Sequence, residues 1–173
     1  MLQTVLFETL CGNCDHKNCC TNSAVPLVLG KDLEKIKNKN PEYVKHLKTV
    51  EISGKNVFAI KKKEGVSECI FWDESLGGCT IYDSRPMDCR LYPFDIMLVE
   101  KSYHWIVYTC NKNSDWTWSE NYLKTLEQDE GFEDLMKNIG LFSEHTNMVL
   151  PTELEKTPFE ILRKVNWNDD ISK

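Results

Sequence analysis

Eight cysteines are the residues of this chain best suited to chemistry, and they form two groups. The first group lies within ten positions near the start of the sequence and consists of Cys11, Cys14, Cys19 and Cys20. The second group is spread over forty-two positions and consists of Cys69, Cys79, Cys89 and Cys110. Cysteine side chains either pair as disulfides or bind metals as thiolates, so their spacing and surroundings must distinguish the two.

Disulfide pairing is the alternative that an even number of cysteines allows. Domains stapled by disulfides are usually much shorter, whereas 173 residues with 41% hydrophobic side chains are enough to close one core. A bond between the adjacent Cys19 and Cys20 would need a strained ring. Unrelated buried cysteines explain the pattern even less well, because free cysteines do not gather at C-x2-C-x4-C-C spacing.

Metal ligation explains the spacing better. In the C-x2-C pair of Cys11 and Cys14, the loop can turn back so that both sulfurs face one point, as in zinc sites and iron–sulfur clusters. A bound metal lowers the pKa of the thiols and holds them as thiolates. His16 lies in the polar loop that follows, and we interpret it as solvated and not as a ligand.

The distribution of the cysteines favours an iron–sulfur cluster over zinc. Eight thiolates are enough for two four-cysteine sites, or for one four-sulfur site with the other cysteines around it. Structural zinc sites favour two compact C-x2-C hairpins. This chain has one such hairpin, and Cys69, Cys79 and Cys89 are isolated. A [4Fe–4S] cluster, which takes four thiolates or three with one open iron, fits isolated ligands better, and zinc is the alternative.

Two of the chain's three arginines, Arg85 and Arg90, flank Cys89. Lysine is the common surface cation here, and the planar guanidinium suits bidentate contacts to carboxylate or phosphate and also donates to cluster sulfurs. We therefore predict that both arginines bind a cofactor or an anionic substrate. The alternative is that they are buried and donate to backbone carbonyls in the turn around Pro86 and Pro93.

Hydrophobic periodicity and turn signals predict the elements that must position these residues. Together these elements indicate an α+β fold: a small cysteine-rich, metal-centred domain with short β-hairpins and peripheral helices. We predict helices over 32–39, 41–50, 119–128 and 132–142, and a short helical turn that starts at 85–88 and carries Cys89. We predict β-hairpins over 50–63 and 94–110 with turns at 54–56 and 100–102, short strands at 69–72 and 79–82, and a last strand over 158–165. The metal-binding core should span 1–112, a helical extension packed on it 113–165, and a loose tail 166–173.

Two stretches together resemble a known family. "CGNCDHKNCC" at 11–20 and "GCTIYDSRPMDCRLYPF" at 78–94 resemble the YkgJ family, the "CxxCxxxxCC" group described as zinc- or iron-chelating proteins. The resemblance covers roughly residues 8–112 and implies that all eight cysteines, including Cys110, occupy positions that the family uses. The stretch 25–36 also looks like the family's strand-then-helix segment after the first cysteine group.

This family is related to flagellin lysine N-methylase, which carries a similar cysteine domain. The resemblance implies that some relatives bind a [4Fe–4S] cluster and use S-adenosylmethionine as a methyl donor. A group-transfer activity such as protein lysine N-methylation is therefore one hypothesis. The present chain is shorter and shows neither a glycine-rich loop of Rossmann type nor a C-x3-C-x2-C motif.

Composition narrows the partners. A net charge of −6 argues against non-specific nucleic-acid binding, and no apolar run reaches the ~20 residues of a membrane helix. The N-terminus does not have the pattern of a signal peptide, so we expect a cytoplasmic, reducing compartment. The expected partners are metal ions and a small anionic or protein substrate.

Three functional classes follow from these observations. The first is an iron–sulfur enzyme that carries out group transfer. The second is a non-catalytic metal-binding module for metal handling, redox sensing or electron transfer. The third is a structural zinc protein that acts through partner contacts.

Overall fold

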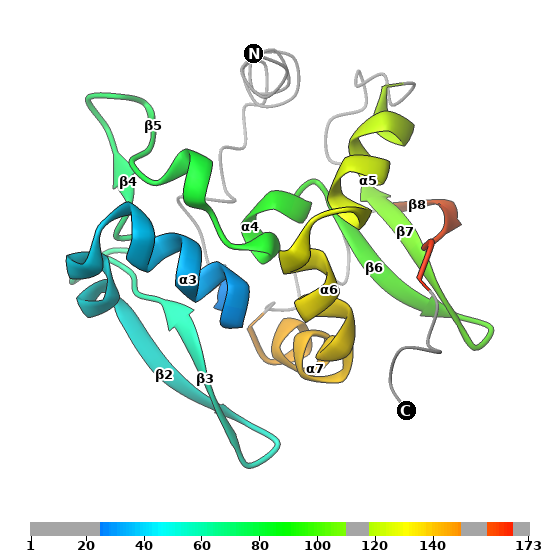
Figure 1. Ribbon diagram of the computed structural model, residues 1–173, viewed down its shortest axis with the longest axis horizontal. Coiled ribbons are helices and arrows are strands. Elements are labelled where there is room, and N and C mark those ends of the chain that lie inside the picture. Colours follow the sequence, from blue (N-terminus) through cyan, green and yellow to red (C-terminus); the bar gives the residue numbers. More distant parts are fainter. Residues whose placement is uncertain (1–24, 110–117, 150–158, 168–173) are drawn as a thin grey trace.

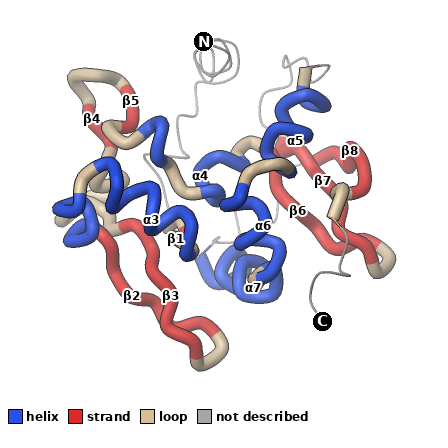
Figure 2. Tube along the Cα trace, in the orientation of Figure 1, coloured by secondary structure: helices blue, strands red, loops and turns tan. Residues whose placement is uncertain are grey.

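Three small antiparallel sheets and a series of short helices make up the computed structural model (Figure 1). It describes residues 25–109, 118–149 and 159–167. Within these residues, helices and strands are interspersed and do not fall into separate blocks (Figure 2). The predicted α+β class is confirmed.

The first sheet has the order β1-β3-β2 and belongs to the N-terminal half. Its strands are β1 (Leu27–Val28), β2 (Leu47–Ile52) and β3 (Lys55–Ile60). Ser53 and Gly54 close the β2–β3 hairpin with φ angles of 49° and 73°, the positive values that a two-residue turn of this kind requires. The predicted hairpin is therefore confirmed, with its turn one residue earlier than expected.

A helix, α3 (Gly30–Lys39), follows β1 and packs beside this sheet. It ends before Pro41, whose ring cannot continue a helix, and Asn40 accepts a hydrogen bond from the N–H of Glu42. The helix predicted over 41–50 is wrong in its second half: a 3-10 helix, η2 (Pro41–His46), leads directly into β2. The β-branched side chains of Thr49 and Val50 suit a strand, and both residues pair with β3.

The second large sheet has the order β6-β7-β8. Its strands are β6 (Phe94–Val99), β7 (Ser102–Tyr108) and β8 (Phe159–Lys164). The predicted β6–β7 hairpin is confirmed, and its turn residues Glu100 and Lys101 have φ angles of 45° and 70°. The predicted last strand is confirmed as β8.

Three helices pack on or beside this sheet: α5 (Ser119–Glu127), α6 (Glu130–Lys137) and α7 (Ile139–Val149). The helix predicted over 132–142 is in fact two helices, because α6 stops at Asn138, whose side chain donates to the carbonyl of Asp134. The main core lies between the helices and the sheet. There the Trp105 ring stacks on Phe132 at 5.4 Å, and both side chains are fully buried.

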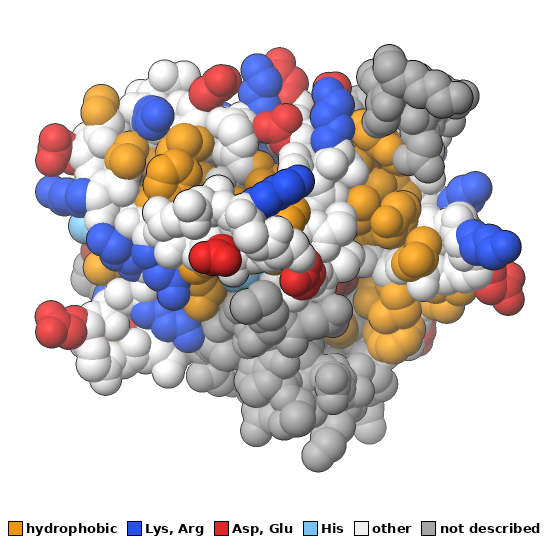
Figure 3. Space-filling view, turned by 90° about the horizontal axis from the view of Figure 1, so that it is seen from below, with side chains coloured by type: hydrophobic (Ala, Val, Ile, Leu, Met, Phe, Trp, Pro, Cys, Tyr) orange, Lys and Arg blue, Asp and Glu red, His pale blue; other side chains and the backbone are white. Residues whose placement is uncertain are grey.

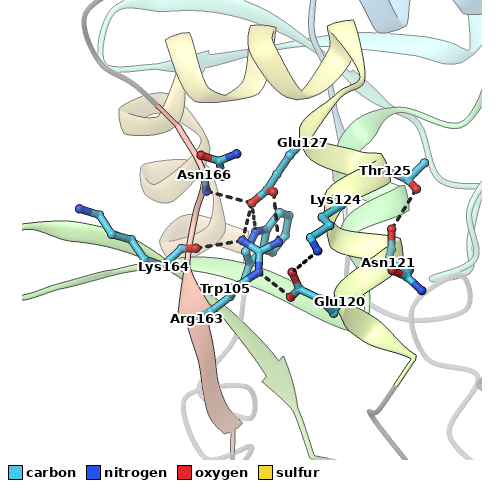
Figure 4. A network of polar contacts seen from close by, with 9 residues as sticks. All are labelled: Trp105, Glu120, Asn121, Lys124, Thr125, Glu127, Arg163, Lys164 and Asn166. Carbon is cyan, nitrogen blue, oxygen red and sulfur yellow. Dashed lines mark hydrogen bonds and ion pairs between the residues drawn. The ribbon is translucent and has the colours of Figure 1, made fainter.

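A polar network fastens β8 to α5 (Figure 4). The carboxylate of Glu127, only 5% exposed, accepts from the indole N–H of Trp105 at 2.7 Å and from the guanidinium of Arg163 at 2.7 and 3.1 Å. It also accepts from the backbone N–H of Asn166 at 2.9 Å. One buried carboxylate thus connects three segments that are distant in sequence.

The cysteine-bearing middle segment runs from the upper left of Figure 1, where the β4–β5 hairpin lies above α3, to the centre of the view, where α4 lies between α3 and α6. It contains a two-stranded hairpin and two short helices: β4 (Trp72–Asp73), β5 (Gly78–Cys79), η3 (Tyr82–Ser84) and α4 (Met87–Leu91). The strands predicted at 69–72 and 79–82 are shorter and shifted, with Trp72 opposite Cys79. The helical turn predicted to carry Cys89 is confirmed as α4.

The surface is uneven in character. Three large hydrophobic side chains of the second sheet stay exposed, namely Leu98, Phe159 and Ile161. Figure 3 shows hydrophobic side chains gathered on the right of one face and a group of lysine and arginine side chains on its left. Within the described ranges, no helix combines the length and apolar character that crossing a membrane would require.

Candidate metal centre

Three of the predicted ligands, Cys69, Cys79 and Cys89, come from three different elements but meet one part of the core. Cys69 forms an isolated bridge with Lys62 just before β4, Cys79 ends β5, and Cys89 lies in α4. All three are free thiols, partly buried against one hydrophobic cluster. We call it the cysteine-side cluster, and its buried members are Val28, Ile36, Leu47, Ile60, Phe71 and Ile81.

Backbone N–H groups lie near two of these sulfurs. The amides of Phe71 and Trp72 lower the pKa of the Cys69 thiol and the amide of Ile81 lowers that of Cys79, while the Trp72 N–H donates to the Cys69 carbonyl at 3.0 Å. Burial raises the pKa of both thiols, and these donors act in the opposite direction because they favour the thiolate. Amide donors at residues that follow the cysteine are the local geometry expected around metal-bound thiolates.

The Cys89 thiol is in the least favourable place for a negative charge. Burial raises its pKa well above the ordinary value, and the neighbouring Asp88 and the sulfurs of Cys69 and Cys79 raise it further. Arg85 acts in the opposite direction. The three thiols are therefore close enough to influence one another, and a bound cation would be needed to hold them together as thiolates.

The two predicted arginines lie in different surroundings. The guanidinium of Arg85 stacks 3.6 Å above the centre of the Tyr82 ring and its Nε donates to the Tyr82 carbonyl at 3.0 Å. It also lowers the pKa of Cys79. Arg90 instead forms an ion pair with Asp129 at 2.8 Å, and its side chain is 14% exposed. Their predicted roles in cofactor binding stay predictions, with Arg85 nearer to the sulfurs.

The remaining predicted ligands lie outside the described residues: Cys11, Cys14, Cys19, Cys20 and Cys110. His16, which we interpreted as solvated, lies outside them as well. Among the residues that the structure does describe, no three His, Cys, Asp or Glu side chains form a group that could hold a metal ion. The described thiols fit a thiolate-bound metal by their chemistry, through soft sulfur donors, N–H groups and a nearby guanidinium. They need further ligands to complete a site.

Sequence reasoning missed a set of carboxylates around α4, of which Asp32 is the most buried at 1% exposure. It lies on α3 among lysines, in a pattern that is typical of a solvated helix face. One signal was available, because Asp32 precedes the fully buried Ile36 by four residues and so shares its helix face.

Comparison with known proteins adds a family. The family model CxxCxxCC, described as "Putative zinc- or iron-chelating domain", matches residues 10–111, more than half of the chain. No curated protein and no solved structure shows significant similarity to this chain. The matched range contains all eight cysteines, including the three that meet at the cysteine-side cluster. The chain therefore belongs to the CxxCxxCC family, whose shared feature is a zinc- or iron-chelating domain.

Proposed function

We propose that the chain holds an iron–sulfur cluster, with Cys69, Cys79 and Cys89 supplying ligands together with cysteines of the 11–20 run and Cys110. The metal-binding part of this proposal rests on the family. The observation that carries the choice of cluster is the origin of the three described ligands. They come from a loop, a strand and a helix, not from paired C-x2-C turns.

The surroundings of the sulfurs support a cluster. A polynuclear thiolate cluster is negatively charged and partly buried, so N–H donors and a guanidinium stabilise it. Phe71, Trp72 and Ile81 supply such donors, and Arg85 supplies the cation. A bound cluster would provide electron transfer, or an open iron for a substrate.

Group transfer from S-adenosylmethionine stays a prediction from the resemblance. A non-catalytic metal-binding role would use the same ligands. Turnover with S-adenosylmethionine and a lysine-containing protein substrate distinguishes the two once the metal is known.

Anaerobic purification of the full chain, followed by metal and sulfide analysis and an absorption spectrum, tests the proposal. We expect a brown protein with iron, sulfide and a broad band near ~400 nm. A colourless protein with stoichiometric zinc would overturn the cluster and favour a closed zinc site. Cys89→Ser should lose metal. Cys79→Ser tests whether the strand cysteine is a ligand as well.

A further inference from the structure

The helix that carries Cys89 is too short to hold its own position. Helix α4 has five residues, and helices of that length are not stable in isolation. Its N-cap, Pro86, provides no side-chain hydrogen bond. The position of the Cys89 sulfur therefore depends on what other elements do to α4.

Asp32 of α3 makes the first of three connections. Its Oδ2 accepts from the backbone N–H of Met87, the first residue of α4, at 3.0 Å in a fully buried contact. This N–H has no partner inside a helix, so an acceptor from elsewhere must satisfy it. Met87 lies two positions before Cys89, and the contact spans 55 residues of sequence.

The other two connections come from either side of Cys89 itself. Asp88 accepts from the backbone N–H of Leu27 in β1 at 2.7 Å. Arg90 donates to Asp129, the N-cap of α6, at 2.8 Å. In addition, the hydroxyl of Tyr122 on α5 donates to the carbonyl of Arg90 at 2.7 Å. Residues 87, 88 and 90 of α4 are thus each fixed by a different element.

We propose that Asp32, Asp88 and Asp129 fix α4 from three sides and set the position of Cys89 before metal binds, with Asp32 as a positioning residue for that ligand. The inference rests on the proposed role of Cys89 as a ligand. It goes further by assigning the preorganisation of the site to carboxylates that bind no metal themselves.

The unsatisfied oxygen of its buried carboxylate distinguishes Asp32 from Asp88 and Asp129. Its Oδ1 is buried without a hydrogen-bond partner among the described residues, and it lies near Gly131 of α6. A buried carboxylate with one oxygen unsatisfied is less favourable for folding than an apolar side chain of the same size. The contact that this carboxylate makes with α4 is the N–H of Met87, so holding that group is its structural contribution.

Two neutral replacements of similar size separate this role from the effect of a buried charge. Asp32→Asn keeps an oxygen acceptor for Met87, whereas Asp32→Leu removes the acceptor and the charge together. We expect metal-loaded Asp32→Leu to release metal to a chromogenic chelator at least about tenfold faster than wild type, and Asp32→Asn to stay close to wild type. Equal release rates in the two variants would overturn the proposal.

Asp134 provides the matched control. It lies on α6 and accepts from the backbone N–H of Lys31 on α3 at 2.8 Å, so it joins α3 to α6, whereas Asp32 joins α3 to α4. Asp134→Leu should lower thermal stability and leave the rate of metal release unchanged. Faster release in Asp134→Leu, to the extent seen in Asp32→Leu, would show a general loosening and contradict a specific role.

Hydrogen exchange on the metal-free full chain tests directly whether α4 is in place before metal binds. Because it uses the wild-type chain, this test does not depend on the folding of a variant. We expect the Met87 amide to be protected before metal is added. Free exchange that becomes protected only with metal would overturn the proposal. A wild-type chain that binds neither iron nor zinc would instead defeat the proposed function, and the Met87 amide would still decide whether α4 is preset.

Discussion

Asp32 has its carboxyl group where a negative charge is costly. Burial raises its pKa to about 6, although the N–H of Met87 and the charges of Lys35 and Arg90 act in the opposite direction. The negative charge of Asp129 also raises the pKa of Asp32, and its effect is smaller than that of burial. The folded chain therefore holds this proton at pH values where the unfolded chain has lost it.

This shift predicts a stability that falls as pH rises. In the unfolded chain Asp32 ionises near its ordinary value of 3.8, and in the folded chain at about 6. Its contribution is complete below the lower pKa and is lost between them, by about 3 kcal/mol. We expect urea unfolding from pH 4 to pH 7 to show this loss in wild type, compared with Asp32→Asn. Parallel curves for the two proteins would contradict it.

Arg85 provides a second prediction for a single residue. Its guanidinium is held by the ring and carbonyl of Tyr82 and favours the thiolate forms of Cys79 and Cys89. In the iron-loaded protein, Arg85→Gln should lower the reduction potential by about 40 mV for a one-electron couple, equivalent to about 1 kcal/mol. Arg85→Lys should retain most of the wild-type potential. A potential unchanged in Arg85→Gln, measured by redox titration, would remove Arg85 from the site.

At the scale of elements, Glu127 and Glu120 form a natural pair for comparison, because both accept from Arg163. Glu127 is buried and satisfies two further donors, whereas the side chain of Glu120 is 48% exposed. Removing one member of a buried pair leaves uncompensated charge and unsatisfied donors. An exposed pair contributes little. The attachment of β8 should therefore depend on Glu127.

We expect Glu127→Ala to lower the free energy of unfolding by about 3–5 kcal/mol. Glu120→Ala should lower it by less than about 1 kcal/mol. Chemical denaturation of both variants under the same conditions checks this. Similar losses in the two variants would mean that Arg163 does not distinguish the carboxylates. A small loss in Glu127→Ala would mean that β8 is held by backbone pairing alone.

Local patterns predicted most of the elements. Turn residues indicated both long hairpins, and the sequence also predicted the short strands near Cys69 and Cys79 and the helical turn that carries Cys89. The strand from Leu47 was missed because its lysine and valine pattern also fits a helix, and pairing with β3 decides between them. The cysteine ligands were predicted from a local pattern as well, their spacing, and they stay predictions.

Contacts between distant elements could not be read from the sequence. The bonds from Met87 to Asp32 and from Arg90 to Asp129 span 55 and 39 residues. The spacing of Asp32 and Ile36 indicates that Asp32 shares a buried helix face, but no local pattern encodes which element its carboxylate meets. Arg90 was therefore predicted near a ligand, while its acidic partner was not.

At the scale of the whole molecule, the described residues contain two main hydrophobic clusters, which differ in size and in the elements packed around them. The main core packs sheet β6-β7-β8 against helices and contains fully buried Trp105 and Phe132. The cysteine-side cluster is smaller, and the β4–β5 hairpin beside it has two paired positions. A hairpin of that size is not stable by itself. Metal binding should therefore stabilise the two parts unequally.

This inequality predicts how the molecule responds to metal removal. A ligand that binds only the folded state stabilises it by about 4 kcal/mol when its free concentration is about 1,000 times the Kd. We expect a chelator to remove that stability and to speed hydrogen exchange mainly in 69–81, around Cys69 and the β4–β5 hairpin. The amides of α6 around Phe132 should stay protected because the described residues of their core include no cysteine. Faster exchange spread evenly over both clusters would show that the metal supports the fold as one unit, and unchanged exchange in 69–81 would exclude these cysteines as ligands.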